Sequence, residues 1–202
     1  MADDHPFAQY VRILGRGRKK SRPLTEEEAY DAQSMILRGE VEPLQLGAFL
    51  MLLRVKEETA EEVAGFVRAI RDNLSLPDPL PEVDLDWSSY AGKRRQLPWF
   101  ILSALLLAQN GVRVFMQGTE GHTPGRIYTR ETLESLGVPT ATSFEQAAEH
   151  LAARNFAYLP LDKMCPIMHE IIEYRPLLGL RSPAHTVGRM INPLRAPYLL
   201  QG

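Results

Sequence analysis

The sequence has 202 residues, a formal net charge of −2 and an apolar fraction of 45%. These values are typical of globular proteins and exclude collagen-like, coiled-coil and wholly disordered chains. No apolar run reaches the roughly 20 residues of a membrane-spanning helix, and the N-terminus has no secretory signal pattern, so we expect no membrane association. Cys165 is the only cysteine, which excludes an intrachain disulfide and favours a reducing, cytoplasmic location.

The small net charge conceals an uneven distribution along the chain. Residues 1–23 hold six basic and two acidic side chains, residues 24–87 hold five and fifteen, and residues 88–202 hold twelve and eight. Electrostatics therefore predicts that a polyanion would contact the two ends of the chain and avoid its middle.

Residues 1–76 are predicted to form a helical domain. A short helix is expected over 7–14, and capping boxes of Thr25 with Glu28 and of Thr59 with Glu62 predict the starts of two more. Between them, a helix that begins at Pro43 carries apolar side chains on every face. Such a helix is either core or a subunit interface, so we expect a homodimer formed through this domain.

Prolines at 77, 79 and 81 predict an extended linker over residues 77–83. Beyond it, residues 84–202 alternate between helical and strand patterns. Helices are expected over 98–109, 130–136, from Ser143 and over 166–178, and strands over 112–115 and 156–159. This alternation predicts an α/β domain with a mainly parallel sheet. The predicted fold class is therefore a helical bundle followed by a partial α/β domain.

Three stretches near the N-terminus carry a family resemblance: Leu24–Ala29, Leu44–Lys56 and Gly65–Arg71. They resemble anthranilate phosphoribosyltransferase and the wider glycosyltransferase family 3, which includes pyrimidine nucleoside phosphorylases. Weaker similarity continues through residues 133–138, 175–182 and 192–193. The resemblance implies that the chain lacks more than another hundred residues at its C-terminus, and the sequence does not tell whether Gly202 is the natural end.

The resemblance also makes the mismatches informative. Where the family has a Gly-Thr-Gly-Gly-Asp turn for the ribosyl diphosphate, this chain has residues 88–95, which include Tyr90 and Gly92. A diphosphate approaches consecutive backbone amides only where side chains are absent, so Tyr90 is expected to obstruct it. The family's polar helix start aligns with residues 98–101, and its Lys-His-Gly-Asn-Arg aligns with residues 116–120, so most of the donor-substrate chemistry is lost.

Other parts of the family site are retained in altered form. Arg175 aligns with the arginine that holds the aromatic acceptor. The family's acidic pair for Mg²⁺ would lie beyond Gly202, so no cofactor is certain and Mg²⁺ is expected only if transferase activity is retained. The altered substrate loop comprises Tyr90, Gly92, Gly118, Gly121, His122, Gly125 and Arg126.

Two basic segments are candidate phosphate or nucleic-acid sites. The N-terminal basic segment comprises Arg16, Arg18, Lys19, Lys20 and Arg22, and the second basic segment comprises Lys93, Arg94 and Arg95. Retention of the scaffold with an altered phosphate turn resembles the YbiB-type paralogues, which implies homodimers that bind DNA or RNA without sequence specificity. Tyr10, Tyr90 and Trp99 could stack on bases, although core packing is the favoured interpretation of Trp99.

The alternative is an active phosphoribosyltransferase or nucleoside phosphorylase-type enzyme with a rebuilt phosphate loop and a phosphorylated sugar as ligand. The second basic segment would then replace the missing amides, but the sequence assigns no catalytic residue. The five histidines show no metal-ligand spacing with one another or with Cys165, so no metal site is predicted. Cys165 is interpreted as a buried, inert thiol.

Overall fold

The computed structural model describes residues 4–17, 19–121 and 123–201, which form two compact units. The first unit comprises residues 1–73 and 174–187, and the second comprises residues 74–173 and 188–202. Residues 174–187 therefore belong with the first unit, whereas the sequence placed them in the α/β domain. None of the described helices is long and apolar enough to cross a membrane.

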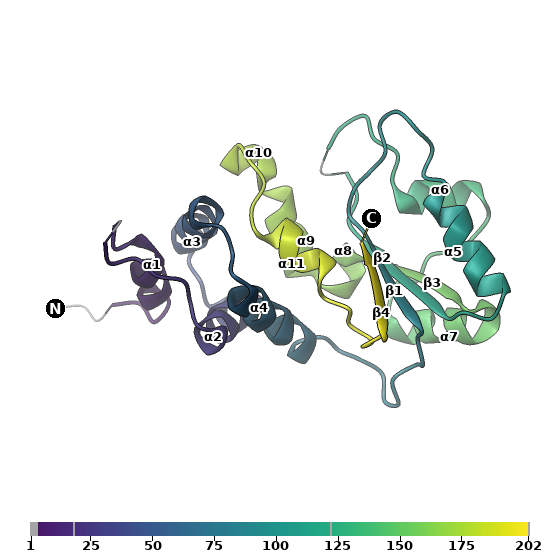
Figure 1. Cartoon of the computed structure of the whole chain (residues 1–202), viewed down its shortest axis with the longest axis horizontal. Coiled ribbons are helices and arrows are strands. Elements are labelled where there is room, and N and C mark those ends of the chain that lie inside the picture. The colour runs from purple at the N-terminus through teal and green to yellow at the C-terminus, as the bar shows by residue number, and fades with distance from the viewer. Residues whose placement is uncertain (1–3, 18, 122, 202) are drawn as a thin grey trace. The chain divides into compact units, whose positions relative to one another are not determined.

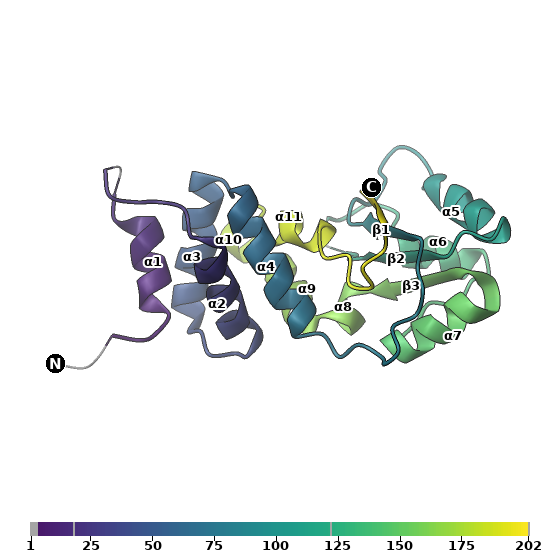
Figure 2. The ribbon, with the colours of Figure 1, turned by 60° about the horizontal axis from the view of Figure 1, so that its bottom comes forward.

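The first unit is a bundle of helices, which Figure 1 and Figure 2 show in two orientations. The predicted capping boxes are confirmed, because Thr25 and Thr59 each accept a hydrogen bond from the amide three residues later. Pro43 occupies the first turn of its helix, as predicted. The helices of this unit are α1 (Ala8–Gly15), α2 (Glu26–Leu37), α3 (Pro43–Lys56), α4 (Ala60–Asp72), α10 (Arg175–Leu178) and the first part of α11 (Ala184–Arg189).

Aromatic side chains connect three of these helices. The Phe49 ring meets the rings of Phe7 and Phe66 edge to face, with centroids 5.2 and 6.2 Å away. All three side chains are buried, and such pairs add about 0.5–1.5 kcal/mol each beyond the area that they bury. Ring contacts therefore hold the start of α1 against α3, and α3 against α4.

Helices α2 and α4 pack closely at Gly65. A Cβ atom at this position would lie 2.2 Å from the Glu26 carbonyl oxygen and 2.8 Å from the Ala29 Cβ. Near the start of α4, the buried Glu62 carboxylate accepts hydrogen bonds from the backbone amides of Leu24 and Thr59 and from Lys56 Nζ. This carboxylate therefore connects the segment before α2, the end of α3 and the start of α4.

The second unit contains a four-stranded parallel sheet with strand order β3-β2-β1-β4. In register, Leu85 lies beside Val114, and Val114 lies beside Phe156. The predicted parallel sheet is confirmed. The elements of this unit are β1 (Leu85–Ser89), α5 (Phe100–Gln109), β2 (Val114–Gly118), α6 (Thr129–Ser135), α7 (Phe144–Arg154), β3 (Phe156–Pro160), α8 (Leu161–Met164), α9 (Pro166–Glu173) and β4 (Tyr198–Gln201), together with the end of α11.

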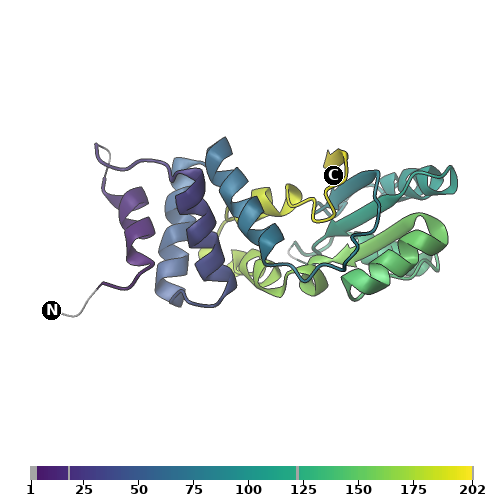
Figure 3. The same cartoon turned by 90° about the horizontal axis from the view of Figure 1, so that it is seen from below.

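Helices cover both faces of the sheet. Val114 and Met116 of β2 pack in one core with Ile101 of α5 and Leu133 of α6. Phe115 points to the opposite face, because side chains alternate along a strand, and its ring stacks on Phe144 of α7 with centroids 6.3 Å apart. Figure 3 shows α5 and α7 on opposite sides of the strands. Because these strands are parallel, the carboxyl ends of β1, β2 and β3 lie together at one edge of the sheet.

The helix predicted over 166–178 is divided in the structure. Helix α9 ends at Glu173, and α10 begins only at Arg175. Pro176 explains the interruption, because its nitrogen carries no hydrogen and its ring clashes with the carbonyl of the preceding turn. Strands β1 and β4 are absent from the elements predicted from the sequence. For β1 the reason is that its last two serines were assigned to a turn.

Acid is expected to lower the stability of the second unit by protonating Asp84. Hydrogen bonds from the Arg113 guanidinium, and then from the Arg113 amide, lower the pKa of Asp84 to about 2. A lowered folded-state pKa adds stability above the ordinary value of about 3.8, and that stability is lost as the pH falls toward 2. Denaturant midpoints measured from neutral pH to about pH 2 should fall less steeply for Asp84→Asn than for the parent chain. An equal fall of the midpoint with pH in the two proteins would contradict this prediction. The control is Glu134→Gln, which removes an exposed carboxylate of α6.

Candidate functional site

The carboxyl ends of β1, β2 and β3 form the candidate site. The strands are parallel and in register, so Ser89, Gly118 and Pro160 end them at the same edge of the sheet. In open α/β sheets, ligands bind at this edge. The family resemblance predicts the phosphate-binding segments at residues 88–95 and 116–120, which include the ends of β1 and β2.

Tyr90 fills the space directly after β1. Its side chain is 1% exposed, and its hydroxyl donates a 2.7 Å hydrogen bond to Gln117 Oε1 on β2. A Cβ at Gly188 would lie 2.8 Å from the Tyr90 ring, so the ring is held closely from the other side. Burial, and then the nearby Asp86, raise the pKa of the Tyr90 phenol well above its ordinary value, so it stays neutral. Tyr90 is inaccessible, and the prediction that it could stack on bases is wrong.

Gly92 and Gly118 serve close packing. A Cβ at Gly92 would lie 2.7 Å from the Tyr128 ring, and the Gly92 carbonyl accepts a 3.0 Å hydrogen bond from Arg126. A Cβ at Gly118 would lie 1.9 Å from the Ser89 carbonyl oxygen. Lys93 and Ile127 pair as an antiparallel bridge. The backbone at Gly92 is therefore covered by residues 126–128 of the same unit.

A charged network occupies the ends of β2 and β3. Glu120 Oε1 accepts hydrogen bonds from the Tyr158 hydroxyl at 2.6 Å and from the Arg130 amide at 3.1 Å. The Arg130 guanidinium lies 3.1 Å from Glu120 and 2.7 Å from Asp162. The Glu120 carboxylate is thus already bound to protein groups. The sequence did not predict that Tyr158 and Arg130 contact Glu120, because Tyr158 lies in β3, Arg130 lies in α6 and no motif spacing connects them.

The rest of the altered substrate loop is also bound within the second unit. The Thr119 hydroxyl lies 3.1 Å from His169 Nδ1, and the Thr123 amide donates to the Tyr128 hydroxyl. Gly121 and Gly125 have positive φ angles of 80° and 71°, which glycine adopts without strain. His122 lies outside the described residues. These hydrogen bonds connect the segment between β2 and α6 to other residues of the second unit.

The two basic segments differ in how far their charges are already paired. Arg16, Lys19 and Lys20 are exposed, whereas Arg22 binds both carboxylate oxygens of Glu28 at 2.6 Å. Arg18 lies outside the described residues. In the second basic segment, Arg94 and Arg95 are exposed, and Lys93 Nζ lies 5.3 Å from the centre of the Phe100 ring. The two segments belong to different units, and a shared binding surface stays a prediction.

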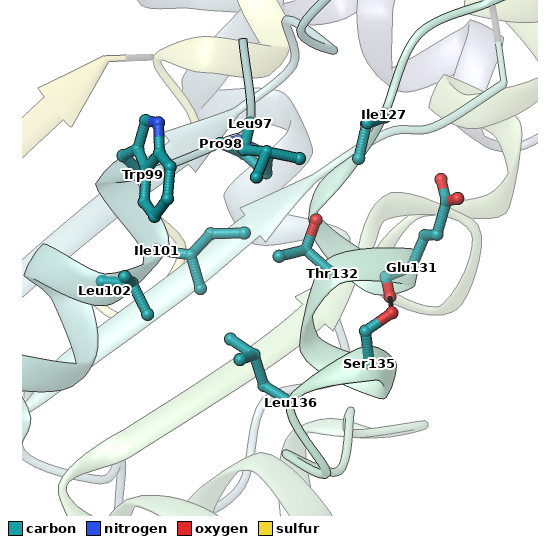
Figure 4. Close-up of a pocket in the computed structure, with 10 residues that line it drawn as sticks. All are labelled: Leu97, Pro98, Trp99, Ile101, Leu102, Ile127, Glu131, Thr132, Ser135 and Leu136. Atoms are coloured by element: carbon teal, nitrogen blue, oxygen red, sulfur yellow. Dashed lines mark hydrogen bonds between the residues drawn. The ribbon is translucent and has the colours of Figure 1, made fainter.

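A small apolar pocket of about 300 Å³ is lined in part by the residues that follow the second basic segment in the chain. Figure 4 shows Trp99, Ile101 and Leu102 on one side of it and residues of α6 on the other. The Trp99 side chain is 61% exposed, so the expectation that it packs in the core is wrong. Tyr10, in contrast, is buried. Of the three aromatic residues considered for base stacking, Trp99 alone is accessible.

The other predicted site residues lie elsewhere. Arg175 begins α10 in the first unit, and it is partly buried. Cys165 is buried as predicted, and burial raises the pKa of its thiol. Within the described residues, no three histidine, cysteine, aspartate or glutamate side chains are grouped so that they could hold a metal ion.

Comparisons with known proteins agree with the fold. Residues 8–74 match the helical bundle domain of the glycosyl transferase family. YbiB of Escherichia coli (strain K12) is 30% identical over 192 residues, which cover 93% of this chain and 59% of that protein. The crystal structure of anthranilate phosphoribosyltransferase from Thermus thermophilus covers 98% of this chain and 58% of its own, with 26% identity and a TM-score of 0.77.

A second solved structure shares the fold at lower identity. Anthranilate phosphoribosyltransferase from Saccharomyces cerevisiae in complex with PRPP and Mg has a TM-score of 0.70 and 18% identity, and the match covers 95% of this chain and 56% of that one. The chain thus spans less than three fifths of each of these relatives.

Proposed function

We propose that this chain, which is an anthranilate phosphoribosyltransferase-like protein of the glycosyl transferase family, binds DNA or RNA through its phosphates and without reading the sequence. The observation that carries the proposal is the contrast between two sets of groups. The groups at the strand ends hydrogen-bond to one another, whereas Arg94 and Arg95 are exposed to solvent.

Phosphate contacts suit these cations. Arginine presents a planar fork of donors to phosphate oxygens, and lysine offers a mobile point charge. Arg16, Lys19 and Lys20 provide further exposed cations, and glycines at 15 and 17 flank Arg16. The accessible Trp99 ring, four residues after Arg95, is suited to contact bases or sugars next to bound phosphates. None of these contacts requires a particular base, so the binding is sequence-independent.

The dimer predicted through the helical domain remains part of the proposal. Its support is the exposed apolar surface of α3, on which Leu44 and Val55 are each 86% exposed. Large apolar side chains at such exposure favour a protein contact over contact with water.

Salt dependence tests the nucleic-acid proposal. The double variant Arg94→Ala/Arg95→Ala should bind a DNA duplex more weakly and reduce the slope of log affinity against log salt by about 1.8, because each lost phosphate contact removes about 0.9. Lys19→Ala/Lys20→Ala tests the N-terminal basic segment in the same way. The charge-matched control is Arg54→Ala/Lys163→Ala, which removes two cations outside both segments. If the control reduces the slope as much as the two test variants, the segments have no specific role.

The second candidate function is a transferase, which the S. cerevisiae complex with PRPP and Mg brings into consideration. Tyr90 and the network of Glu120 argue against a sugar diphosphate at the ends of these strands, because the space is filled and the cation is paired. Calorimetry of the full chain with phosphoribosyl diphosphate and Mg²⁺ should show no binding. Heat that disappears in the Arg94→Ala/Arg95→Ala variant would instead support a rebuilt phosphate loop.

A further inference from the structure

A second hollow lies in the first unit, far from the strand ends in sequence. It has a volume of about 470 Å³, within the range of about 300–1,000 Å³ of small-ligand pockets. Residues of α1, α2 and α4 line it, together with Asn73, which follows α4. The lining groups that the inference uses are Tyr10, Tyr30, Asp31, Ser34, Arg38 and Asp72.

The charge of this pocket is negative. Asp31 and Asp72 contribute two carboxylates from different helices. The Arg38 guanidinium, which also lines the pocket, is bound by two nitrogens to Glu40 at 2.7 and 2.8 Å, so its charge is offset locally. Burial raises the pKa of the Tyr10 phenol, and the negative charges of Asp31 and Glu28 raise it further. The pocket therefore favours a cation.

One wall of the pocket is held in place before any ligand arrives. The Tyr30 hydroxyl donates a 3.2 Å hydrogen bond to Asp72, and the Arg68 guanidinium lies 4.5 Å from the centre of the Tyr30 ring. Arg68 is itself fixed by ion pairs with Glu26 and Glu27. Tyr30 and Asp72 thus keep their positions without a cost in side-chain ordering at binding.

Ser34 supplies an independent sign of a ligand. The residue is 5% exposed, it lines the pocket, and its Oγ has no hydrogen-bond partner within the described part of the chain. A buried hydroxyl without a partner loses free energy unless a ligand or water completes it. Because the described residues offer no cluster of three metal-ligating side chains, the expected cation is organic.

We propose that this pocket binds a primary ammonium group on a short aliphatic stem, as in a small diamine. The carboxylates of Asp31 and Asp72 would accept hydrogen bonds from the ammonium, and Ser34 Oγ would accept another. The methylene stem would lie against the Tyr10 ring and Met35, which also line the pocket. This site is independent of the basic segments and of the proposed nucleic-acid binding.

Calorimetry on the full chain tests the proposal with butane-1,4-diamine as the probe. We expect saturable binding at one site per chain. Butane-1,4-diol has the same stem without charge and should give no binding. Asp31→Asn and Asp72→Asn should each weaken diamine binding about tenfold or more, as expected for a hydrogen bond to a charged group. Glu61→Gln, which removes an exposed carboxylate of α4 outside the pocket, should leave it unchanged.

The proposal would be overturned by no diamine binding, by equal weakening in Glu61→Gln, or by displacement of the diamine by an equal concentration of Mg²⁺. Either of the last two results would show general attraction of cations to an acidic helical block. Ser34→Ala retains both carboxylates and provides a variant that should fold. In amide spectra of the isotope-labelled chain, the diamine should shift the signals of Ser34 and its neighbours, and this shift should be reduced in Ser34→Ala. Unchanged shifts in that variant would place the diamine elsewhere.

Discussion

Gly65→Ala should destabilise the helical unit by about 3 kcal/mol, since overpacking of a close contact typically costs about 1–3 kcal/mol and here the contact is with backbone. The added Cβ would lie 2.2 Å from the Glu26 carbonyl oxygen and 2.8 Å from the Ala29 Cβ. Neither group is the mobile end of a side chain, so α2 and α4 would have to separate. Denaturant unfolding followed by far-ultraviolet circular dichroism measures the loss.

Gly47→Ala is the matched control for this experiment. Gly47 also lies inside a helix, α3, but nothing lies within 4 Å of the Cβ that it would gain. Alanine is favoured over glycine in helix interiors by about 1 kcal/mol. Gly47→Ala should therefore leave stability unchanged or raise it. Similar midpoints for the two variants would show that α2 and α4 do not need this close approach.

Removing the carboxylate of Glu62 should cost about 3–5 kcal/mol, the range observed when one partner of a buried ion pair is deleted. Glu62 is 0% exposed. In Glu62→Ala, Lys56 Nζ would lose its carboxylate partner at 2.7 Å and keep only the Glu57 carbonyl, and the amides of Leu24 and Thr59 would lose their acceptors at 2.8 and 2.9 Å. The cost therefore comes from a largely buried cation without a counter-charge and from two amides without acceptors.

The neighbouring Glu61 separates this effect from a simple loss of charge. It precedes Glu62 in the first turn of α4, but it is exposed. Glu61→Ala should change the free energy of unfolding by less than about 0.5 kcal/mol, as is usual at surface positions. Glu62→Gln should recover part of the lost stability, because its amide oxygen can still accept one or two of the three hydrogen bonds. If Glu62→Ala unfolds at the same midpoint as Glu61→Ala, the carboxylate does not hold these segments together.

Helices α1 to α4 of the first unit could be predicted because their signals are local. Thr25 with Glu28 and Thr59 with Glu62 determine where α2 and α4 begin, and the structure contains both capping boxes. Glu62 also accepts a hydrogen bond from the amide of Leu24, which lies 38 residues earlier in the chain. A capping box does not predict this contact. The same limit applies to β1 and β4, whose pairing depends on strands far away in sequence.

The surroundings of the site residues could not be predicted from the sequence. The family resemblance predicts that Tyr90 obstructs a diphosphate, but the hydrogen bond of Tyr90 to Gln117 and its contact with Gly188 depend on the packing of β2 and α11. Trp99 was expected in the core because large aromatic side chains are usually buried, yet it lies at the rim of an open pocket. Burial is a property of the whole unit, and a single position does not reveal it.

The burial of Tyr90 has a consequence for the stability of the second unit. In Tyr90→Gly, Gln117 would lose the hydrogen bond from the phenol, and the space beside Gly188 would become a cavity. Loss of a large buried aromatic side chain costs about 3–5 kcal/mol, a substantial part of the stability of an ordinary domain. The side chain that closes the strand ends therefore also supports the core of the second unit, so opening the space after β1 would weaken the fold around it.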